Sequence, residues 1–192
     1  MMFYKDKCTG CGKCKKVCAN PEKCVFCGKC EIFCPADARR ICGKEYTAQE
    51  VFSEVVKDKP YYDNSGGGVT LSGGEVMLQT DEIVPLIELL RQNGIAVLID
   101  TAGNVPYRYF EKLNPIVDGY LFDFKTASYE KYKSIGGGMK TVTENIRNLI
   151  RDGVNLHIRI PLIPDFNTDE DSINGICEKL TELGIKAVEL LP

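Results

Sequence analysis

The sequence lacks any long hydrophobic run, and it contains a single histidine against ten cysteines. No stretch approaches the roughly 20 consecutive apolar residues that cross a bilayer, so we expect no membrane-spanning helix and no membrane partner. The first seven residues lack the apolar core of a secretory signal peptide, so we expect a cytoplasmic location. No Gly-Lys-Ser/Thr follows the glycine runs at 66–68 and 136–138, which excludes a Walker phosphate-binding loop.

The cysteines are concentrated near one end of the chain. Nine of the ten lie within residues 8–42, and Cys177 is the tenth. A disulfide framework needs an oxidising compartment, and no export signal is visible, so the pattern favours metal ligands in a reducing cytoplasm. We expect Cys42 and Cys177 to be buried thiols without a ligand role, the latter packed in a helix with Ile176 and Leu180.

Eight of these cysteines form two similar runs. In each run three cysteines are separated by two residues, and a fourth follows after three more, as in bacterial ferredoxins. The fourth thiolate of each run reaches the cluster of the other run. The predicted ligands are Cys8, Cys11, Cys14 and Cys34 for the first [4Fe-4S] cluster, and Cys24, Cys27, Cys30 and Cys18 for the second. Structural zinc is the alternative, but it uses two pairs of cysteines, whereas each run here offers three at short spacing.

The charge distribution agrees with two clusters. Residues 1–44 carry ten Lys/Arg and four Asp/Glu, a net charge of +6, whereas residues 45–192 carry 14 and 23, a net charge of −9. A basic segment often binds nucleic acid, but two clusters of about −2 each would offset most of the excess. Because the lysines are not accompanied by an aromatic stacking platform, we expect no nucleic-acid partner.

From residue 47 onward, predicted helices and strands alternate. The first is a helix at 47–57, which begins with a capping-box signature at Thr47 and Glu50. Strands are predicted at 68–71, 95–101, 117–125, 154–160 and 187–190, and helices at 81–92, 106–113, 141–151 and 169–183. Such repetition predicts a parallel sheet with right-handed crossovers. We therefore expect an α/β fold: a partial (β/α) barrel over residues 46–192, preceded by a ferredoxin-like 2[4Fe-4S] domain over residues 1–45.

Polar residues gather where the predicted strands end. Asp100 and Thr101 end the second strand, Asp123 and Lys125 share one face of the third, and Arg159 lies on one face of the fourth. Ligands of parallel α/β sheets bind at the carboxyl ends of the strands. A filled small barrel would not tolerate so many inward ionisable groups, so we predict a wide barrel that holds a polar cofactor. A rim of solvated ion pairs is the alternative.

Four segments carry a more specific pattern. They are residues 61–75, ending in Ser72-Gly73-Gly74-Glu75, then Asp100-Thr101-Ala102-Gly103, Asp123-Phe124-Lys125, and residues 158–164. With these segments the chain resembles the activating enzymes of glycyl radical enzymes, typified by those of pyruvate formate-lyase, in the radical S-adenosylmethionine (SAM) superfamily. The two ferredoxin-type runs resemble those of the subgroup that carries auxiliary clusters.

The resemblance implies a radical chemistry. A further [4Fe-4S] cluster binds SAM, one electron cleaves the sulfonium, and a 5′-deoxyadenosyl radical takes hydrogen from a glycine of the partner, a glycyl radical enzyme. A flavodoxin or ferredoxin-type protein would donate the electron, and the auxiliary clusters would relay it. By resemblance the cofactor-binding residues are Gly73, Gly74, Glu75, Asp123, Phe124, Lys125 and Arg159, and Asp100 and Thr101 form a possible monovalent-cation site.

The chain departs from the family pattern in its cysteines. The Cys-x3-Cys-x2-Cys that holds the SAM-binding cluster is expected before the ferredoxin runs, together with a first strand, and the 192 residues do not contain it. The chain is therefore expected to be an inactive or incomplete fragment of an activating enzyme, without the catalytic-cluster cysteines. Two alternatives are an iron–sulfur electron-transfer protein and a non-catalytic module that binds a glycyl radical enzyme.

Overall fold

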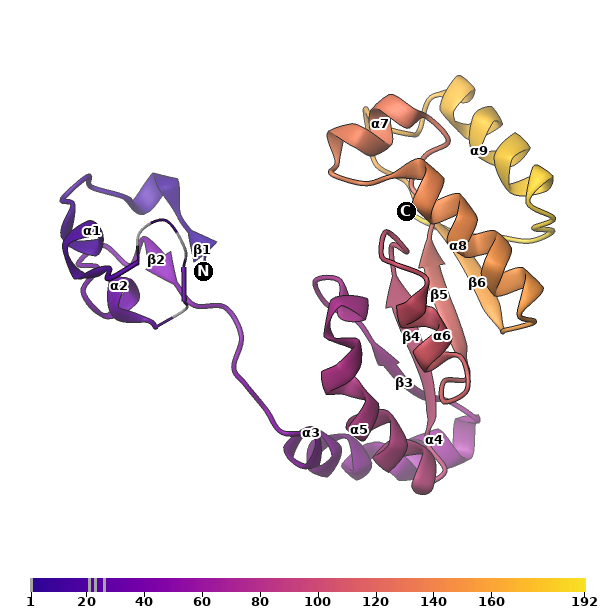
Figure 1. Cartoon of the computed structure of the whole chain (residues 1–192), viewed down its shortest axis with the longest axis horizontal. Helices are drawn as coiled ribbons and strands as arrows, with labels where there is room; N and C mark the ends of the chain where they lie inside the picture. Colours follow the sequence, from indigo (N-terminus) through magenta and orange to yellow (C-terminus); the bar gives the residue numbers. More distant parts are fainter. Residues whose placement is uncertain (1, 21, 23, 26) are drawn as a thin grey trace. The chain divides into compact units, whose positions relative to one another are not determined.

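The chain folds as two units, Met1–Tyr46 and Thr47–Pro192. A computed structural model describes residues 2–20, 22, 24–25 and 27–192, and Figure 1 labels its helices and strands. Among these residues, none of the helices combines the length and the hydrophobicity needed to cross a bilayer.

The first unit is built from short elements. They are β1 (Met2–Phe3), the 3-10 turn η1 (Lys5–Lys7), α1 (Lys13–Val17), α2 (Lys29–Ile32) and β2 (Arg39–Arg40). β1 pairs with β2 in antiparallel fashion, with Phe3 opposite Arg39. Gly12 and Gly28 precede the two helices at φ values of 71° and 75°, a left-handed conformation that glycine adopts readily. Each helix therefore begins directly after a Cys-Gly pair, and α1 and α2 start in the same way.

The second unit contains a parallel sheet and the helices that connect its strands. Its elements are α3 (Ala48–Val55), η2 (Val56–Asp58), α4 (Lys59–Ser65), β3 (Gly68–Leu71), η3 (Val76–Gln79), α5 (Thr80–Gln92), β4 (Ala96–Thr101), α6 (Arg108–Leu113), β5 (Gly119–Asp123), α7 (Tyr129–Ser134), α8 (Met139–Arg151), β6 (Leu156–Pro161), α9 (Glu170–Glu182) and β7 (Glu189–Leu191). Within the described residues the strands pair in the order β3-β4-β5-β6-β7, all parallel. The predicted α/β fold with a parallel sheet is confirmed, and it is consistent with a partial barrel.

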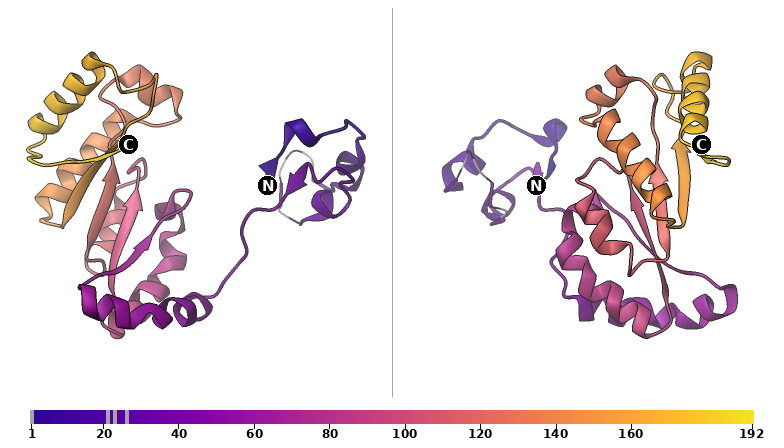
Figure 2. Two further views of the ribbon diagram at one scale, coloured as in Figure 1. Left: turned by 180° about the vertical axis from the view of Figure 1, so that it is seen from behind. Right: turned by 45° about the vertical axis from the view of Figure 1, so that its right-hand side comes forward.

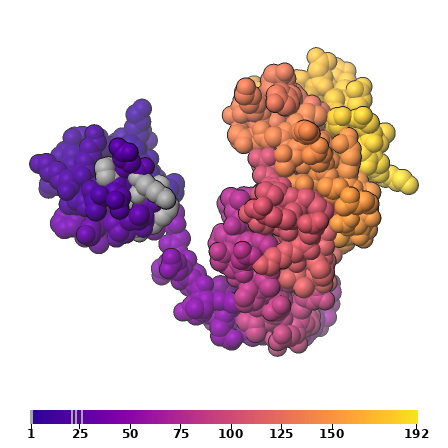
Figure 3. Space-filling view, viewed as in Figure 1, coloured from indigo at the N-terminus to yellow at the C-terminus, as the bar shows by residue number. Residues whose placement is uncertain are grey.

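One face of the sheet is apolar and covered by helices. Ile99, Phe122 and Ile158 lie on this face and are almost fully buried, because alternate side chains of a strand point to the same side. Helix α8 contributes an apolar stripe that includes Ile146 and Leu149. Helices α6 and α8 lie in front of the sheet in Figure 1, and atoms of their colours, red to orange, face the viewer in Figure 3. Seen from behind, the strands themselves face the viewer (Figure 2, left).

The predicted helix starts and ends are largely those of the structure. The capping box is present: the hydroxyl of Thr47 accepts from the Glu50 amide at 3.2 Å, and the Glu50 carboxylate accepts from the Thr47 amide at 2.7 Å. Helices α4 and α7 were not predicted, because both are short and lack a long apolar stripe. Helix α4 begins with Pro60 in its first turn, where the missing amide hydrogen costs nothing.

Two predictions about isolated cysteines are wrong. Both Cys42 and Cys177 are exposed. In α9 the buried residues are Ile176 and Leu180, and Cys177 lies about 100° around the helix from Ile176, on the solvent side. Cys42 follows β2 in an irregular segment of the first unit, where few side chains are available to cover it.

We predict that Gly103→Ala destabilises the second unit more than Gly153→Ala does. Both glycines have φ of 68°, so both substitutions carry the cost of a left-handed alanine, about 1 kcal/mol. A Cβ at Gly103 would overlap the ring of Phe122, whereas a Cβ at Gly153 would meet no atom within 4 Å. Overpacking should add about 1–3 kcal/mol at Gly103 alone. Guanidinium unfolding followed by circular dichroism measures the difference, and equal losses would contradict the packing argument.

Candidate functional site

The face of the sheet that lies opposite the helix-covered face, here called the inner face, carries a charged network. The network lies at the carboxyl ends of three strands. Arg159 of β6 donates to Asp123 of β5 at 2.8 Å and 3.1 Å, and it also donates to Asp100 of β4. Ser72, just after β3, donates its hydroxyl to Asp100 at 3.0 Å. Because β5 lies between β4 and β6, the Arg159 side chain crosses one strand to reach Asp100. The structure thus brings together three residues that the sequence placed on separate strands.

The network is partly shielded from solvent. The Arg159 side chain is 14% exposed, and those of Asp100 and Asp123 are 22% and 19% exposed. Burial lowers the pKa of the Arg159 guanidinium, but the hydrogen bonds to Asp100 and Asp123 outweigh burial and raise it above its ordinary value. Arg159 therefore stays charged, and it holds two carboxylates close together on the inner face.

Glu75 fixes the loop that follows β3. Its carboxylate accepts from the Thr101 hydroxyl at 2.7 Å, from the Ala102 amide at 3.1 Å and from the Met77 amide at 3.2 Å. These donors belong to the end of β4 and to η3. The Glu75 side chain therefore ties the Gly73–Gly74 turn to the neighbouring strand, and the backbone of that turn lies exposed at the end of the sheet.

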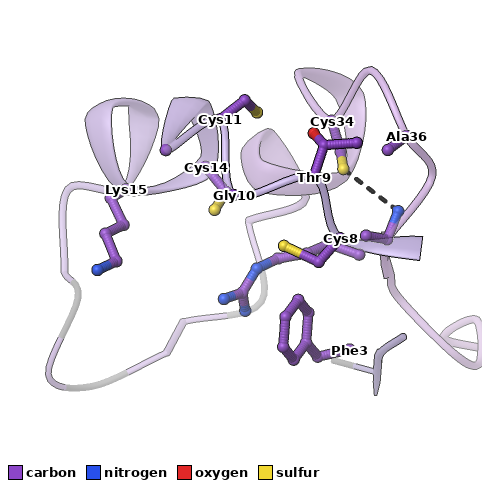
Figure 4. Close-up of a pocket in the computed structure, with 12 residues that line it drawn as sticks. Phe3, Cys8, Thr9, Gly10, Cys11, Cys14, Lys15, Cys34 and Ala36 are labelled. Atoms are coloured by element: carbon purple, nitrogen blue, oxygen red, sulfur yellow. Dashed lines mark hydrogen bonds between the residues drawn. The ribbon is translucent and has the colours of Figure 1, made fainter. Parts of the chain in front are cut away.

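The cysteines of the first unit border two hollows. The first is lined by all four predicted ligands of one cluster, Cys8, Cys11, Cys14 and Cys34. The second is lined by all four predicted ligands of the other cluster, Cys18, Cys24, Cys27 and Cys30. Figure 4 shows the first hollow, where the sulfurs of Cys8 and Cys14 lie toward each other.

The surroundings of Cys34 favour its thiolate. Hydrogen bonding from the backbone at Ala36 is the largest cause that lowers the pKa of this thiol, and the amides of Ala38 and Arg39 add to it against the effect of burial. The Ala38 amide lies 3.2 Å from the Cys34 sulfur, as the dashed line in Figure 4 shows. A thiolate is the form that ligates iron, so the donor set suits the predicted cluster.

Comparison with known proteins identifies the family. The family model of the radical SAM superfamily matches residues 18–174 of this chain. The trans-4-hydroxy-L-proline dehydratase activating enzyme of Clostridioides difficile is 37% identical over 100% of this chain and 69% of its own length. The pyruvate formate-lyase 2-activating enzyme of Escherichia coli (strain K12) is 33% identical over 97% of this chain and 60% of its own length. The chain belongs to the radical SAM activating enzymes of glycyl radical enzymes.

A solved structure supports this assignment. A domain of the pyruvate-formate lyase-activating enzyme from Bacteroides vulgatus ATCC 8482 superposes with a TM-score of 0.55 at 28% identity, over 65% of this chain and 78% of that one. The chain spans 69% and 60% of the lengths of the two curated activating enzymes above. Membership of the radical SAM family implies a [4Fe-4S] cluster and SAM as cofactors.

The structure separates some of the site residues expected for an activating enzyme. The Phe124 side chain is fully buried on the helix-covered side and packs against Tyr132, whereas Asp123 lies on the inner face. The Thr101 hydroxyl contacts Glu75, while the Asp100 carboxylate contacts Ser72 and Arg159, so the two side chains of the possible cation site do not converge. The cofactor and cation assignments of these residues stay predictions.

Sequence reasoning missed two buried asparagines that hold backbone segments next to the site of this activating enzyme. Asn167 is fully buried and donates to the carbonyls of Lys125 and Pro161, both at 2.8 Å. Asn145 of α8 donates to the carbonyls of Gly103 and Val105, both at 2.8 Å. Asn145 occupies a position within the apolar stripe of α8, and a polar residue at such a position was the available signal.

We predict that Arg159→Met lowers the free energy of unfolding by about 2 kcal/mol. The substitution keeps the apolar stem but leaves two carboxylates on the inner face without their cation, and partial exposure reduces the cost below that of a fully buried pair. Arg151→Met is the matched control, because Arg151 is 65% exposed and pairs with neighbouring Asp152. Denaturant unfolding of both variants measures the difference, and a loss at Arg159 no larger than at Arg151 would contradict the role of the network.

Proposed function

We propose that this chain provides the SAM-binding wall and the two auxiliary clusters of an enzyme that activates a glycyl radical enzyme. The charged network on the inner face of the radical SAM sheet is the observation that carries the proposal. SAM presents a sulfonium, an amino group and a carboxylate, so its binding wall needs groups of both signs. Asp100, Asp123 and Arg159 supply both signs at one edge of the sheet.

Each predicted residue has a distinct part in binding. The Gly73–Gly74 turn offers exposed backbone groups to the amino end of the cofactor, and Glu75 holds that turn against β4. Asp123 and Lys125 lie on the same face of their segment, and the Asn167 amide holds the Lys125 carbonyl in place. Arg159 balances the two aspartates and, through its charge, favours the cofactor carboxylate.

The first unit holds two cubane clusters in this proposal. The match between each predicted set of four thiols and one hollow supports it. Such clusters carry single electrons, so they would relay electrons from a flavodoxin or ferredoxin-type donor. Because each iron of a cubane takes one thiolate, eight cysteines complete both clusters and leave no set of three for an open-site cluster. We therefore infer that the 192-residue polypeptide does not cleave SAM by itself.

We predict about eight irons per chain after anaerobic reconstitution, as two cubanes require. Cys34→Ser and Cys18→Ser each remove one ligand of a different cluster, and each should lower the iron content toward one cluster. Cys42→Ser is the control, because Cys42 is exposed and lines neither hollow. Metal analysis with electron paramagnetic resonance (EPR) makes the measurement. Two zinc ions per chain would support the zinc alternative instead.

We predict that the reconstituted chain binds SAM but does not turn it over. Asp123→Asn should weaken binding at least tenfold, whereas Asp171→Asn, at an exposed position of α9, should leave it unchanged. Equilibrium dialysis with labelled SAM measures binding, and chromatography of 5′-deoxyadenosine measures cleavage under reducing conditions. Reversible cluster reduction without SAM affinity would favour the electron-transfer alternative. Turnover well above a cluster-free control would show that the polypeptide is catalytically complete.

A further inference from the structure

Arg39 is the inward-facing residue of the small ribbon in the first unit. In β2, Arg39 is half-buried and Arg40 is exposed, as expected for successive strand residues. Arg39 lies opposite Phe3 of β1, and its guanidinium carbon is 4.7 Å from the centre of the Phe3 ring. This cation–π contact positions the guanidinium beside the aromatic ring.

Arg39 borders both sets of cysteines. It lines the hollow that contains Cys8 and Cys34, and it also lines a cavity of about 550 Å³ that contains cysteines of both sets. The cysteines of this larger cavity are Cys14, Cys18, Cys24 and Cys30. The side chain of Arg39 therefore lies between the two groups of thiols. Lys15 lines the same two spaces, but Lys15 is exposed to solvent whereas Arg39 is half-buried.

One donor of Arg39 is buried without a partner. Its Nε is shielded from solvent and has no hydrogen-bond acceptor within the described part of the chain. Leaving a buried donor of a charged group without an acceptor is energetically costly, so such an atom implies an acceptor that is present in the working protein. Thiols line both spaces that Arg39 borders, so sulfur is an acceptor available on either side of the side chain. Thiolates and inorganic sulfides of a cubane are anionic acceptors.

We propose that Arg39 donates a hydrogen bond to a sulfur of a bound cluster and raises the reduction potential of that cluster. This inference rests on the proposed function of the first unit. Reduction adds one electron to a [4Fe-4S]²⁺ core and gives [4Fe-4S]⁺, so the total charge with four thiolates changes from about −2 to about −3. A cation and a donor at the sulfur stabilise the more negative state. Arg39 thereby makes that cluster easier to reduce by a protein electron donor.

The test is a potentiometric titration of the reconstituted full chain, followed by the EPR signal of the reduced clusters. Arg39→Met keeps the stem that packs on Phe3 but removes the charge and the donors. We expect at least a tenfold fall in the equilibrium constant for one-electron reduction of one cluster, which corresponds to about 59 mV. Arg40→Met is the matched control, because it removes the same charge from the exposed neighbour, and it should change that constant less than threefold.

A second measurement uses the unmutated chain labelled with ¹⁵N-arginine. Pulsed EPR of the reduced clusters should show coupling to an arginine nitrogen, and Arg39→Lys should abolish that coupling. This measurement decides the question if Arg39→Met fails to take up iron.

The outcomes separate the two proposals. A chain that binds zinc, or that shows no iron–sulfur signal, would overturn the proposed function of the first unit. A chain that holds eight irons, with equal potentials in both methionine variants or with no nitrogen coupling, would overturn the role of Arg39 alone.

Discussion

The pairing of Arg159 with two aspartates is the interaction on which the inner face of the sheet depends. Ionisable side chains at the carboxyl ends of adjacent strands are costly unless their charges are balanced. Arg159 balances Asp100 and Asp123 in one contact that spans three strands. The face can therefore remain polar and preformed, while the opposite face of the same strands packs against helices.

The division between the two faces follows from the two-residue period of a strand. In β4, Ile99 is buried with the helices and Asp100 turns to the inner face, and in β5 Phe122 and Asp123 repeat the arrangement. Each strand thus supplies one side chain to the core and the next to the site. The stability of the sheet and the chemistry of its edge are consequently coupled. A shift of one residue in register would turn the core side chains to the inner face and the site side chains into the core.

The first unit depends on a different constraint. It has few buried apolar residues, and among its described residues Ala38 is the one buried hydrophobic residue. A small unit with so little core requires metal clusters or another cross-link for stability. Two cubanes would supply both the cross-links and the negative charge that its lysines and arginines require. In the proposal for Arg39, this side chain belongs to the cluster environment rather than to a solvent-exposed basic surface.

Regular periodicity made much of this chain predictable. The strand–helix alternation, the capping box at Thr47 and the parallel sheet all follow from local patterns that do not need distant partners. Helices α4 and α7 escaped prediction because short helices draw their stability from contacts that sequence spacing does not show. The same reason explains Cys42 and Cys177, whose exposure depends on what packs beside them.

By itself, the sequence determined the two cysteine runs, the α/β fold and the family, since spacing and motif are properties of the chain. Only the tertiary structure decided which charges meet. Asp100 and Arg159 are 59 residues apart, and their contact exists because parallel strands bring their carboxyl ends to one edge. The position of Arg39 between the two sets of thiols likewise depends on how the β1–β2 ribbon folds beside them. The sequence alone does not show it, because Arg39 is one of many basic residues in a basic segment.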